Sequence, residues 1–229
     1  MLASDSSLRI TEVFSSLQGE SLSAGEPTTF IRLTGCPLRC VYCDSAYAFS
    51  GGEIIAIDQL LQQAAQLGNV QVCVTGGEPL AQPDCLTLLQ RLCETGYSVS
   101  LETSGAIDIS PVDSRVRRIM DVKTPSSGES DKNLLDNYGC LTANDELKFV
   151  IADRDDFDWS IGQVERHGLI AKVACVLFSP VFPLPDPQGD APYPAKIIKD
   201  LAEWVLESGL PLRYQLQMHK LIWGDKPGH

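Results

Sequence analysis

Short apolar runs alternate with amphipathic stretches along most of the chain, and this pattern predicts strands that alternate with helices. The first predicted strand, residues 30–34 (FIRLT), leads directly into a loop that contains three cysteines. The spacing of apolar side chains predicts helices over residues 57–67, 84–95, 157–166 and 195–207. Further strands are predicted over residues 70–75, 97–103, 118–122, 146–151, 172–178 and 212–217.

This order of elements favours an α/β fold, because strands that alternate with helices build βαβ units around a parallel sheet. About six strands are fewer than the eight of a closed (β/α)₈ barrel. No G-x-G-x-x-G motif follows the first strand, which disfavours a dinucleotide-binding fold. We therefore predict an open, partial (β/α) barrel of about six parallel strands with truncated helices, formed by a single domain over residues 1–229.

Two stretches interrupt the alternation. Residues 124–133 (TPSSGESDKN) form a polar loop, and residues 179–194 contain six prolines. Prolines at this density favour extended conformations and turns. The proline-rich stretch either closes over an active site or crosses the surface as a rigid connection, and the sequence leaves both interpretations open.

Composition narrows the classes of function. The hydrophobic share of 44% and charged share of 21% are those of a globular protein. A net charge of −12 disfavours electrostatic binding to nucleic acid or to an anionic membrane. The sequence shows no signal peptide and no apolar run long enough to span a bilayer, so we expect a cytoplasmic protein with reduced thiols. Five scattered cysteines are predicted to be buried packing residues: Cys73, Cys85, Cys93, Cys140 and Cys175.

The three remaining cysteines lie within residues 35–44 (GCPLRCVYCD), which we call the cysteine loop. Cys36, Cys40 and Cys43 can bind three irons of a [4Fe–4S] cluster, which leaves the fourth iron open for another ligand. An apolar helix face is one alternative, although Gly35 and Pro37 disfavour a helix here. A zinc site is another, although zinc usually takes four ligands and no second CxxC pair follows. The spacing favours the cluster without settling the choice.

A second motif, the glycine turn of residues 75–79 (TGGEP), follows the end of a predicted strand. Gly76 and Gly77 expose backbone groups to close approach by a ligand, and Glu78 adds an acceptor for an ammonium group. By itself such a motif is more often a tight turn between a strand and a helix. Its position one strand after the cysteine loop makes the pair of motifs specific.

Together these motifs resemble the radical S-adenosylmethionine (radical SAM) superfamily, whose hallmark CxxxCx(aromatic)C is matched by Cys36, Cys40, Tyr42 and Cys43. The resemblance implies that the open iron of the cluster is chelated by the amino and carboxylate groups of SAM. It also implies that Gly76, Gly77 and Glu78 contact the SAM amino group. The reduced cluster of that superfamily cleaves SAM to a 5′-deoxyadenosyl radical.

The resemblance extends along nearly the whole chain to the 7-carboxy-7-deazaguanine synthase family. It rests on residues 16–20 (SLQGE), 30–33 (FIRL), 43–45 (CDS), 101–105 (LETSG) and 219–224 (HKLIWG). That family contracts the ring of 6-carboxy-5,6,7,8-tetrahydropterin with loss of ammonia, in queuosine and other 7-deazapurine biosynthesis. The resemblance implies hydrogen removal from C6 of the pterin, return of the hydrogen to regenerate SAM, a Mg²⁺ ion and a homodimer. It also implies flavodoxin or ferredoxin as the electron donor.

The resemblance assigns the family's site residues to matching positions of this chain. The resemblance places Leu17, Gln18, Gly19, Glu20, Arg32, Thr75 and His219 at the pterin substrate, Ser45 at Mg²⁺, and Tyr42, Ser104, Asp121 and Lys123 at SAM. Many members have Ser-Pro-Lys where this chain has Asp121-Val-Lys123, which leaves the role of Asp121 open.

The residues alone favour plainer interpretations of several of these positions. They predict that SLQGE is a surface turn with a solvated Glu20 and that Arg32 points outward or lies at the edge of the core. Lys148 could reach the site, but a solvated strand lysine is the favoured interpretation.

Two other functions compete with this interpretation. A glycyl-radical-enzyme activase is also a small radical SAM protein, but the short stretch between Cys43 and the glycine turn leaves no room for an added cluster domain. A zinc-stabilised interaction module needs no catalytic site. Colour separates the two classes, because an iron–sulfur protein is brown and a zinc protein is colourless.

Overall fold

The structure, a computed structural model, describes residues 6–182, 196–224, 226 and 228. These residues contain one nine-stranded sheet with the strand order β3-β1-β2-β4-β5-β6-β7-β8-β9. The strands are β1 (Ser7–Leu17), β2 (Pro27–Leu33), β3 (Glu53–Ala56), β4 (Gln71–Gly76), β5 (Ser98–Thr103), β6 (Arg117–Val122), β7 (Glu146–Ile151), β8 (Cys175–Pro180) and β9 (Arg213–Tyr214). The α-helices are α1 (Ile57–Leu67), α2 (Cys85–Glu94), α3 (Asn137–Cys140), α4 (Arg154–Arg166), α5 (Lys196–Ser208) and α6 (Met218–Trp223). Five short 3₁₀ helices are η1 (Ala46–Phe49), η2 (Pro79–Ala81), η3 (Pro125–Ser127), η4 (Ser130–Lys132) and η5 (Leu169–Ala171).

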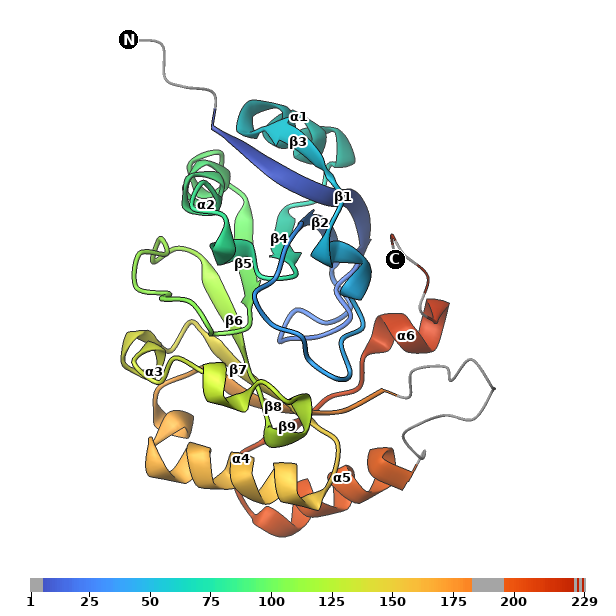
Figure 1. Cartoon of the computed structure of the whole chain (residues 1–229), viewed down its shortest axis with the longest axis vertical. Coiled ribbons are helices and arrows are strands. Elements are labelled where there is room, and N and C mark those ends of the chain that lie inside the picture. The colour runs from blue at the N-terminus through green and yellow to red at the C-terminus, as the bar shows by residue number, and fades with distance from the viewer. Residues whose placement is uncertain (1–5, 183–195, 225, 227, 229) are drawn as a thin grey trace.

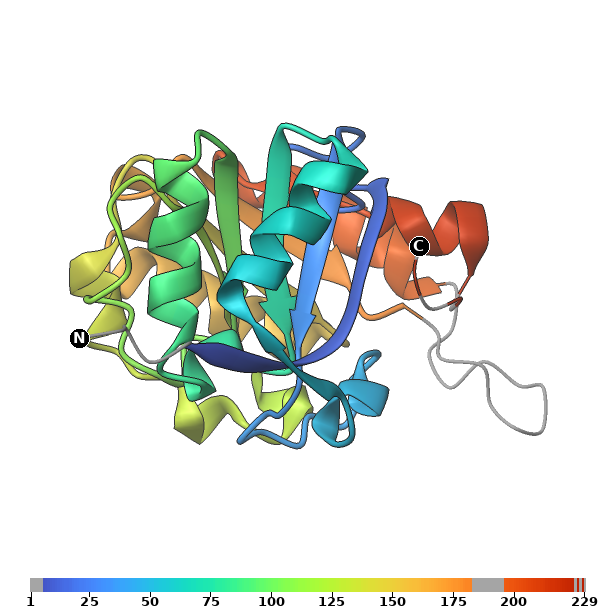
Figure 2. The ribbon, with the colours of Figure 1, turned by 90° about the horizontal axis from the view of Figure 1, so that it is seen from above.

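The sheet forms the predicted open, partial barrel. Strand β2 and strands β4 to β9 run parallel to one another, whereas β1 is antiparallel to both β2 and β3. The sheet curves, and helices α1, α2, α4 and α5 lie along its outer side (Figures 1 and 2). The carboxyl ends of the parallel strands therefore face a common space on the inner side.

Two strands were not predicted from the sequence. Strand β1 extends the sheet beyond β2, but only Leu8 and Ile10 of its side chains are buried, so its apolar signal is weak. Strand β3 has four residues, all at least partly exposed, which is too short for a periodic pattern. Tertiary pairing with β1 determines its conformation.

Two predicted strands were too long. Strand β9 pairs with β8 through Arg213 and Tyr214 only, and the chain then leaves the sheet. Strand β8 begins at Cys175 because η5 and the helical backbone of Lys172 precede it.

Helix α4 begins earlier than predicted, because the side chain of Asp153 caps it by accepting a hydrogen bond from the backbone N–H of Asp156.

The core lies between the sheet and the outer helices, where Leu60, Leu88, Leu89 and Leu92 are completely buried. Cys73 and Cys85 are buried there as predicted. The prediction was wrong for Cys93, Cys140 and Cys175, which are half-buried because they lie near the ends of elements rather than in their centres.

Most of the proline-rich stretch, namely residues 183–194, lies outside the described residues, so neither interpretation of it is tested. Among the residues that are described, no helix is both long and apolar enough to cross a membrane.

A buried ion pair fixes the amino ends of β6 and β7. The Asp145 carboxylate accepts hydrogen bonds from Arg118 Nε at 2.9 Å and Nη2 at 2.5 Å, and from the Thr142 backbone N–H at 2.7 Å. Burial favours the neutral acid, but the hydrogen bonds from Arg118 and Thr142 outweigh it and hold the pKa of Asp145 below its ordinary value. The ionised carboxylate therefore stabilises the folded protein.

We expect Asp145→Asn to lower the free energy of unfolding by about 3–5 kcal/mol, because it leaves Arg118 buried without its counter-charge. Because the pKa is depressed in the folded state, this difference is fully present above the unfolded pKa of about 3.9 and is lost as the pH falls through the folded value. Urea unfolding of the wild-type protein and of Asp145→Asn across this pH range measures the difference in free energy of unfolding.

Asp113→Asn is the matched control, because Asp113 pairs with Arg115 at the surface. Its cost is expected to be about 0–1 kcal/mol. An equal loss of free energy of unfolding in the two variants would show that the buried Asp145–Arg118 pair stabilises the protein no more than a surface pair does.

Candidate functional site

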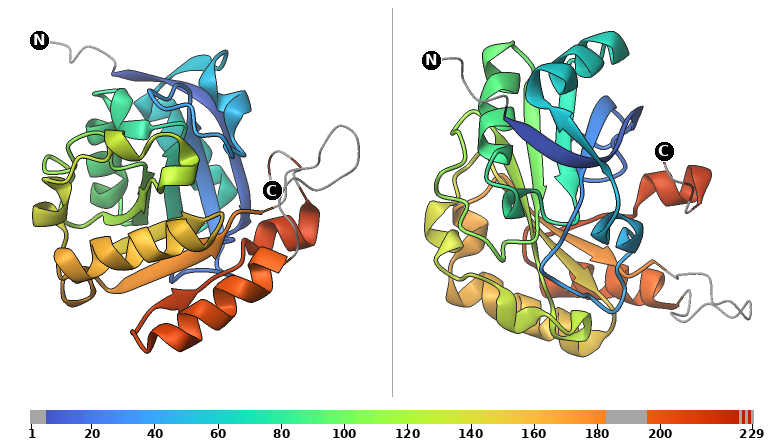
Figure 3. Two further views of the ribbon diagram at one scale, coloured as in Figure 1. Left: turned by 60° about the horizontal axis from the view of Figure 1, so that its bottom comes forward. Right: turned by 45° about the horizontal axis from the view of Figure 1, so that its top comes forward.

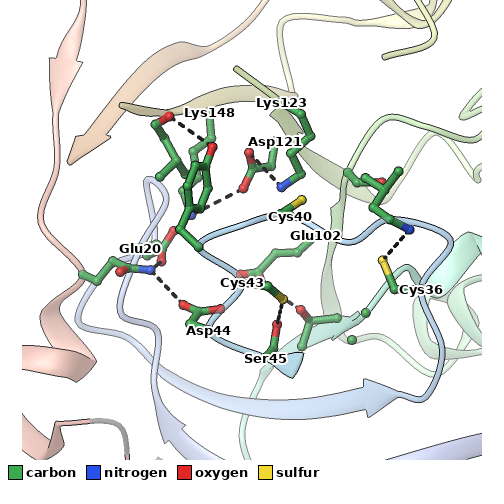
Figure 4. A pocket seen from close by; sticks show the side chains of 18 of the residues that line it. Glu20, Cys36, Cys40, Cys43, Asp44, Ser45, Glu102, Asp121, Lys123 and Lys148 are labelled. Carbon is green, nitrogen blue, oxygen red and sulfur yellow. Dashed lines mark hydrogen bonds and ion pairs between the residues drawn. The ribbon is translucent and has the colours of Figure 1, made fainter. Parts of the chain in front are cut away.

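The carboxyl ends of the parallel strands surround one pocket (Figure 4). Strand register brings its polar side chains together: Arg32 on β2 lies opposite Thr75 on β4, and Asp121 on β6 lies opposite Lys148 on β7. Of the residues predicted for the site, the pocket is lined by Glu20, Arg32, Cys36, Cys40, Tyr42, Cys43, Ser45, Thr75, Gly76, Gly77, Ser104, Asp121, Lys123 and His219. The pocket therefore lies at the carboxyl ends of the strands, where parallel sheets usually place their binding sites.

The cysteine loop is not helical, so the alternative of an apolar helix face was wrong. The backbone N–H of Gly35 donates to the carbonyl of Ala48, and that of Val41 donates to the carbonyl of Ser127. Gly35 has φ of 99°, a left-handed conformation that glycine adopts readily. The loop holds Cys36, Cys40 and Cys43 around the same pocket (Figure 4).

The glycine turn packs directly against the cysteine loop. A Cβ atom on Gly77 would lie 2.4 Å from the carbonyl oxygen of Gly35 and 2.7 Å from the Cβ of Cys36. The backbone N–H of Glu78 also donates to the carbonyl of Gly35 at 2.8 Å. Any side chain at position 77 would therefore push the two motifs apart.

The three thiols fit a cluster better than a single ion. In the described part of the chain, no three His, Cys, Asp or Glu side chains lie close enough to bind one metal ion. The three cysteines instead surround a shared cavity, as they do when each binds a different iron of a cuboidal cluster. Burial raises the pKa of the Cys40 thiol to about 11, so binding of iron there would displace a proton.

Glu78 lies beneath the pocket rather than in its lining. Its carboxylate is completely buried and accepts hydrogen bonds from Leu80 N–H, the Thr103 hydroxyl, and the backbone N–H and hydroxyl of Ser104. Gly76, Gly77 and Ser104 do reach the cavity. Glu78 therefore connects the ends of β4 and β5 and orients the groups that face the ligand.

A chain of ion pairs crosses one side of the pocket (Figure 4). Lys148 pairs with Glu20 and lies 3.8 Å from Asp121, which pairs with Lys123 at 3.2 Å. The predictions that Lys148 and Glu20 are solvated were wrong, since their side chains are 11% and 13% exposed. Burial opposes both charges, but their pairing outweighs it, raising the pKa of Lys148 and lowering that of Glu20.

Arg32 faces the pocket rather than solvent, with its side chain only 17% exposed. Its Nε donates to Glu12 at 2.7 Å, and Glu12 also accepts from the hydroxyl of Tyr47. No described residue accepts a hydrogen bond from the two terminal nitrogens of Arg32. These nitrogens are therefore available to an anionic ligand.

Glu102, in the pocket lining, was missed in the sequence analysis. It accepts hydrogen bonds from the Thr75 hydroxyl at 2.8 Å and from Gln18 Nε2 at 3.2 Å. The side chain of Gln18 is therefore buried behind Glu102 and does not line the pocket itself. Two signals for Glu102 exist in the sequence: its place next to the end of a strand, and its position within the LETSG motif of residues 101–105.

Residues 215–224, which we call the C-terminal segment, close the pocket on another side. Its Lys220 pairs with Asp44 of the cysteine loop at 2.8 Å and holds the pKa of Asp44 well below its ordinary value despite the cost of desolvation. His219 lines the pocket, and burial lowers the pKa of its imidazole, which favours the neutral form. Gly19 lies behind this imidazole, while Leu17 ends strand β1 outside the lining.

Comparison with known proteins agrees with this geometry. A family model described as the radical SAM superfamily matches residues 30–125. A 7-carboxy-7-deazaguanine synthase of Koribacter versatilis is 44% identical over 220 residues, which cover 94% of this chain and 97% of that protein. One of Chlorobaculum tepidum is 39% identical over 226 residues, which cover 97% of each chain.

Solved structures show the same fold. The crystal structure of QueE from Escherichia coli aligns with a TM-score of 0.70 at 22% identity, covering 93% of this chain and 95% of that one. Streptococcus suis SuiB bound to S-adenosylmethionine aligns with a TM-score of 0.56 at 12% identity, covering 80% of this chain and 48% of that one.

We expect Gly19→Ala to displace His219, because the new Cβ would lie 1.9 Å from the imidazole Nδ1 and 3.1 Å from the His219 Cβ. The overpacking should lower the free energy of unfolding by about 1–3 kcal/mol. It should also speed hydrogen exchange in the C-terminal segment, measured by mass spectrometry.

Gly162→Ala is the control, since nothing lies within 4 Å of the added Cβ in helix α4. Alanine there should stabilise the helix by up to about 1 kcal/mol. Unchanged exchange around His219 in Gly19→Ala would contradict the packing described here.

Proposed function

The chain belongs to the 7-carboxy-7-deazaguanine synthase family of radical SAM proteins, and from this we propose that it converts 6-carboxy-5,6,7,8-tetrahydropterin to 7-carboxy-7-deazaguanine with loss of ammonia. The observation that carries the proposal is one pocket that combines three cysteines with an arginine whose terminal nitrogens are unpaired in the described residues. This reaction would supply a step of queuosine or other 7-deazapurine biosynthesis. The comparisons favour it over a glycyl-radical-enzyme activase and over a zinc-stabilised module.

The radical SAM family implies a [4Fe–4S] cluster and SAM. Cys36, Cys40 and Cys43 would bind three irons of the cluster, and their arrangement around one cavity fits that role. When bound, the reduced cluster and SAM supply the 5′-deoxyadenosyl radical that begins the reaction. The residues that would bind SAM are Tyr42, Gly76, Gly77, Ser104, Asp121 and Lys123, with Glu78 positioning the backbone beneath them.

The substrate carboxylate matches Arg32. A guanidinium binds a planar carboxylate through two parallel hydrogen bonds, and Glu12 fixes its orientation from behind through Nε. Glu20, Thr75 and His219 would surround the pterin edge, and the buried Gln18 would support it from behind through Glu102. Because the three lysines of the pocket are already paired with Glu20, Asp44 and Asp121, the terminal nitrogens of Arg32 provide the anion-binding groups.

Ser45 is the proposed Mg²⁺ ligand. Its hydroxyl lines the pocket beside Cys43, at 3.9 Å from the sulfur. Mg²⁺ keeps several waters and takes few protein oxygens, so one hydroxyl with substrate oxygens suits it. The carboxylate of the adjacent Asp44 is already paired with Lys220.

The proposal also covers the domain organisation, oligomeric state, localisation and electron donor of the enzyme. We infer a single domain over residues 1–229 that acts as a cytoplasmic homodimer and takes electrons from flavodoxin or ferredoxin. These points extend the family resemblance.

We expect the anaerobically reconstituted protein to form 7-carboxy-7-deazaguanine from the pterin with SAM, Mg²⁺ and a reductant, detected by mass spectrometry. Cys40→Ala should abolish the product and lower the iron content. Arg32→Ala should raise KM for the pterin by about 10- to 100-fold, because a hydrogen-bonded charge contributes about 1.5–3 kcal/mol.

Two matched variants serve as controls: Cys93→Ala, a half-buried cysteine on α2, and Arg115→Ala, an exposed arginine paired with Asp113. Both should retain iron, product formation and KM. Cleavage of SAM without any pterin product would contradict the proposed substrate and favour a protein substrate instead.

A further inference from the structure

Residues 18–26, which we call the hairpin loop, connect β1 to β2 and contain one strained residue. Ser21 has φ of 69°, and it is the only residue other than glycine with a positive φ among those that the structure describes. A side chain in this left-handed conformation costs free energy, so surrounding contacts must hold it. Such strain is concentrated at functional sites.

Gln215 holds Ser21 through both of its backbone groups. The N–H of Ser21 donates to Gln215 Oε1 at 2.7 Å, and Gln215 Nε2 donates to the carbonyl of Ser21 at 2.9 Å. Gln215 is itself fixed, because it is 8% exposed and its backbone N–H donates to the carbonyl of Phe178 on β8. The amide therefore acts as a template for the conformation of Ser21.

Neighbouring contacts attach the hairpin loop to the amino ends of two strands. The backbone N–H of Leu22 donates to Glu146 at the start of β7 at 2.9 Å, and Arg117 at the start of β6 donates to the Ser23 hydroxyl at 2.8 Å. The hairpin loop and the C-terminal segment lie side by side in Figure 3, left. Neither Leu22 nor Ser23 lines the pocket.

The other side of the hairpin loop supplies the pocket. Glu20, directly before Ser21, pairs with Lys148 and accepts from Gln217 Nε2 at 2.5 Å. The N–H of Glu20 donates to Gln18 Oε1 at 3.2 Å, and Gln18 Nε2 donates to Glu102. Because Glu20 and Ser21 share a peptide bond, the backbone angles of Ser21 determine where the loop carries Glu20.

We propose that Gln215 is a positioning residue for the substrate: it keeps Ser21 left-handed and thereby fixes Glu20 and Gln18 at the pterin side of the pocket. The inference rests on the proposed function for the identity of the substrate. Gln215 itself does not line the pocket. Its effect is therefore expected on substrate binding and not on the cluster or on SAM.

The test compares Q215A, S21G and the double variant in the reconstituted enzyme. Q215A should raise KM for the pterin by about tenfold, the equivalent of losing two neutral hydrogen bonds. Iron content and SAM affinity should stay unchanged. S21G should bind the pterin nearly as wild type does, and S21G/Q215A should recover much of the loss, because glycine adopts a positive φ without support.

Hydrogen exchange over residues 18–26 gives a readout that does not depend on activity. It should be faster in Q215A than in wild type, and slower again in S21G/Q215A. Gln163→Ala is the matched control, since Gln163 is a buried glutamine on α4 that does not line the pocket. It should leave exchange in the hairpin loop and KM unchanged.

Three results would overturn the inference: an unchanged KM and exchange rate in Q215A, a parallel loss of iron and SAM affinity, or no recovery in the double variant. A wild-type protein that binds SAM but forms no product would contradict the proposed function alone. In that case, faster exchange in Q215A that S21G reverses would still support the hold of Gln215 on Ser21.

Discussion

The close approach of the glycine turn to the cysteine loop is the contact on which the rest of the pocket depends. Gly77 has no side chain, so the backbone of the turn packs directly beneath Gly35 and Cys36. The buried carboxylate of Glu78 then joins this turn to the end of β5 through Ser104. Two loops that come from different strands are thereby fixed as one surface, on which a cluster and its ligand can be held in a constant relation.

Charge pairing determines what the pocket can bind. Buried charges are costly unless they are paired, and three acids of the pocket, Asp121, Glu20 and Asp44, pair with Lys123, Lys148 and Lys220. Arg32 differs, because Glu12 engages its Nε while its terminal nitrogens stay open to a ligand. The pocket thus combines several ion pairs with one directional site for an anion. This combination suits a small, polar, carboxylated substrate better than a nucleic acid.

The sequence predicts the parts of this structure that local pattern determines. Apolar runs locate the inner strands, and linked motifs locate the cysteines, the glycines and Arg32. It does not predict β1, β3 or the burial of Lys148, because these depend on pairing between distant segments. Gln215 lies in no motif, and the LETSG motif that contains Glu102 does not show what its side chain contacts. Their roles appear only when the fold places Gln18 and Ser21 beside them.

The contact between Ser21 and Gln215 also bears on how the protein is made. It joins residues 194 positions apart, and contacts over such distances close slowly because of the entropy of the intervening chain. During translation, the cysteine loop and the glycine turn leave the ribosome long before Gln215. The part of the pocket that would bind iron can therefore assemble on the nascent chain, whereas the hairpin loop that carries Glu20 reaches its final conformation only after nearly the whole polypeptide has been made.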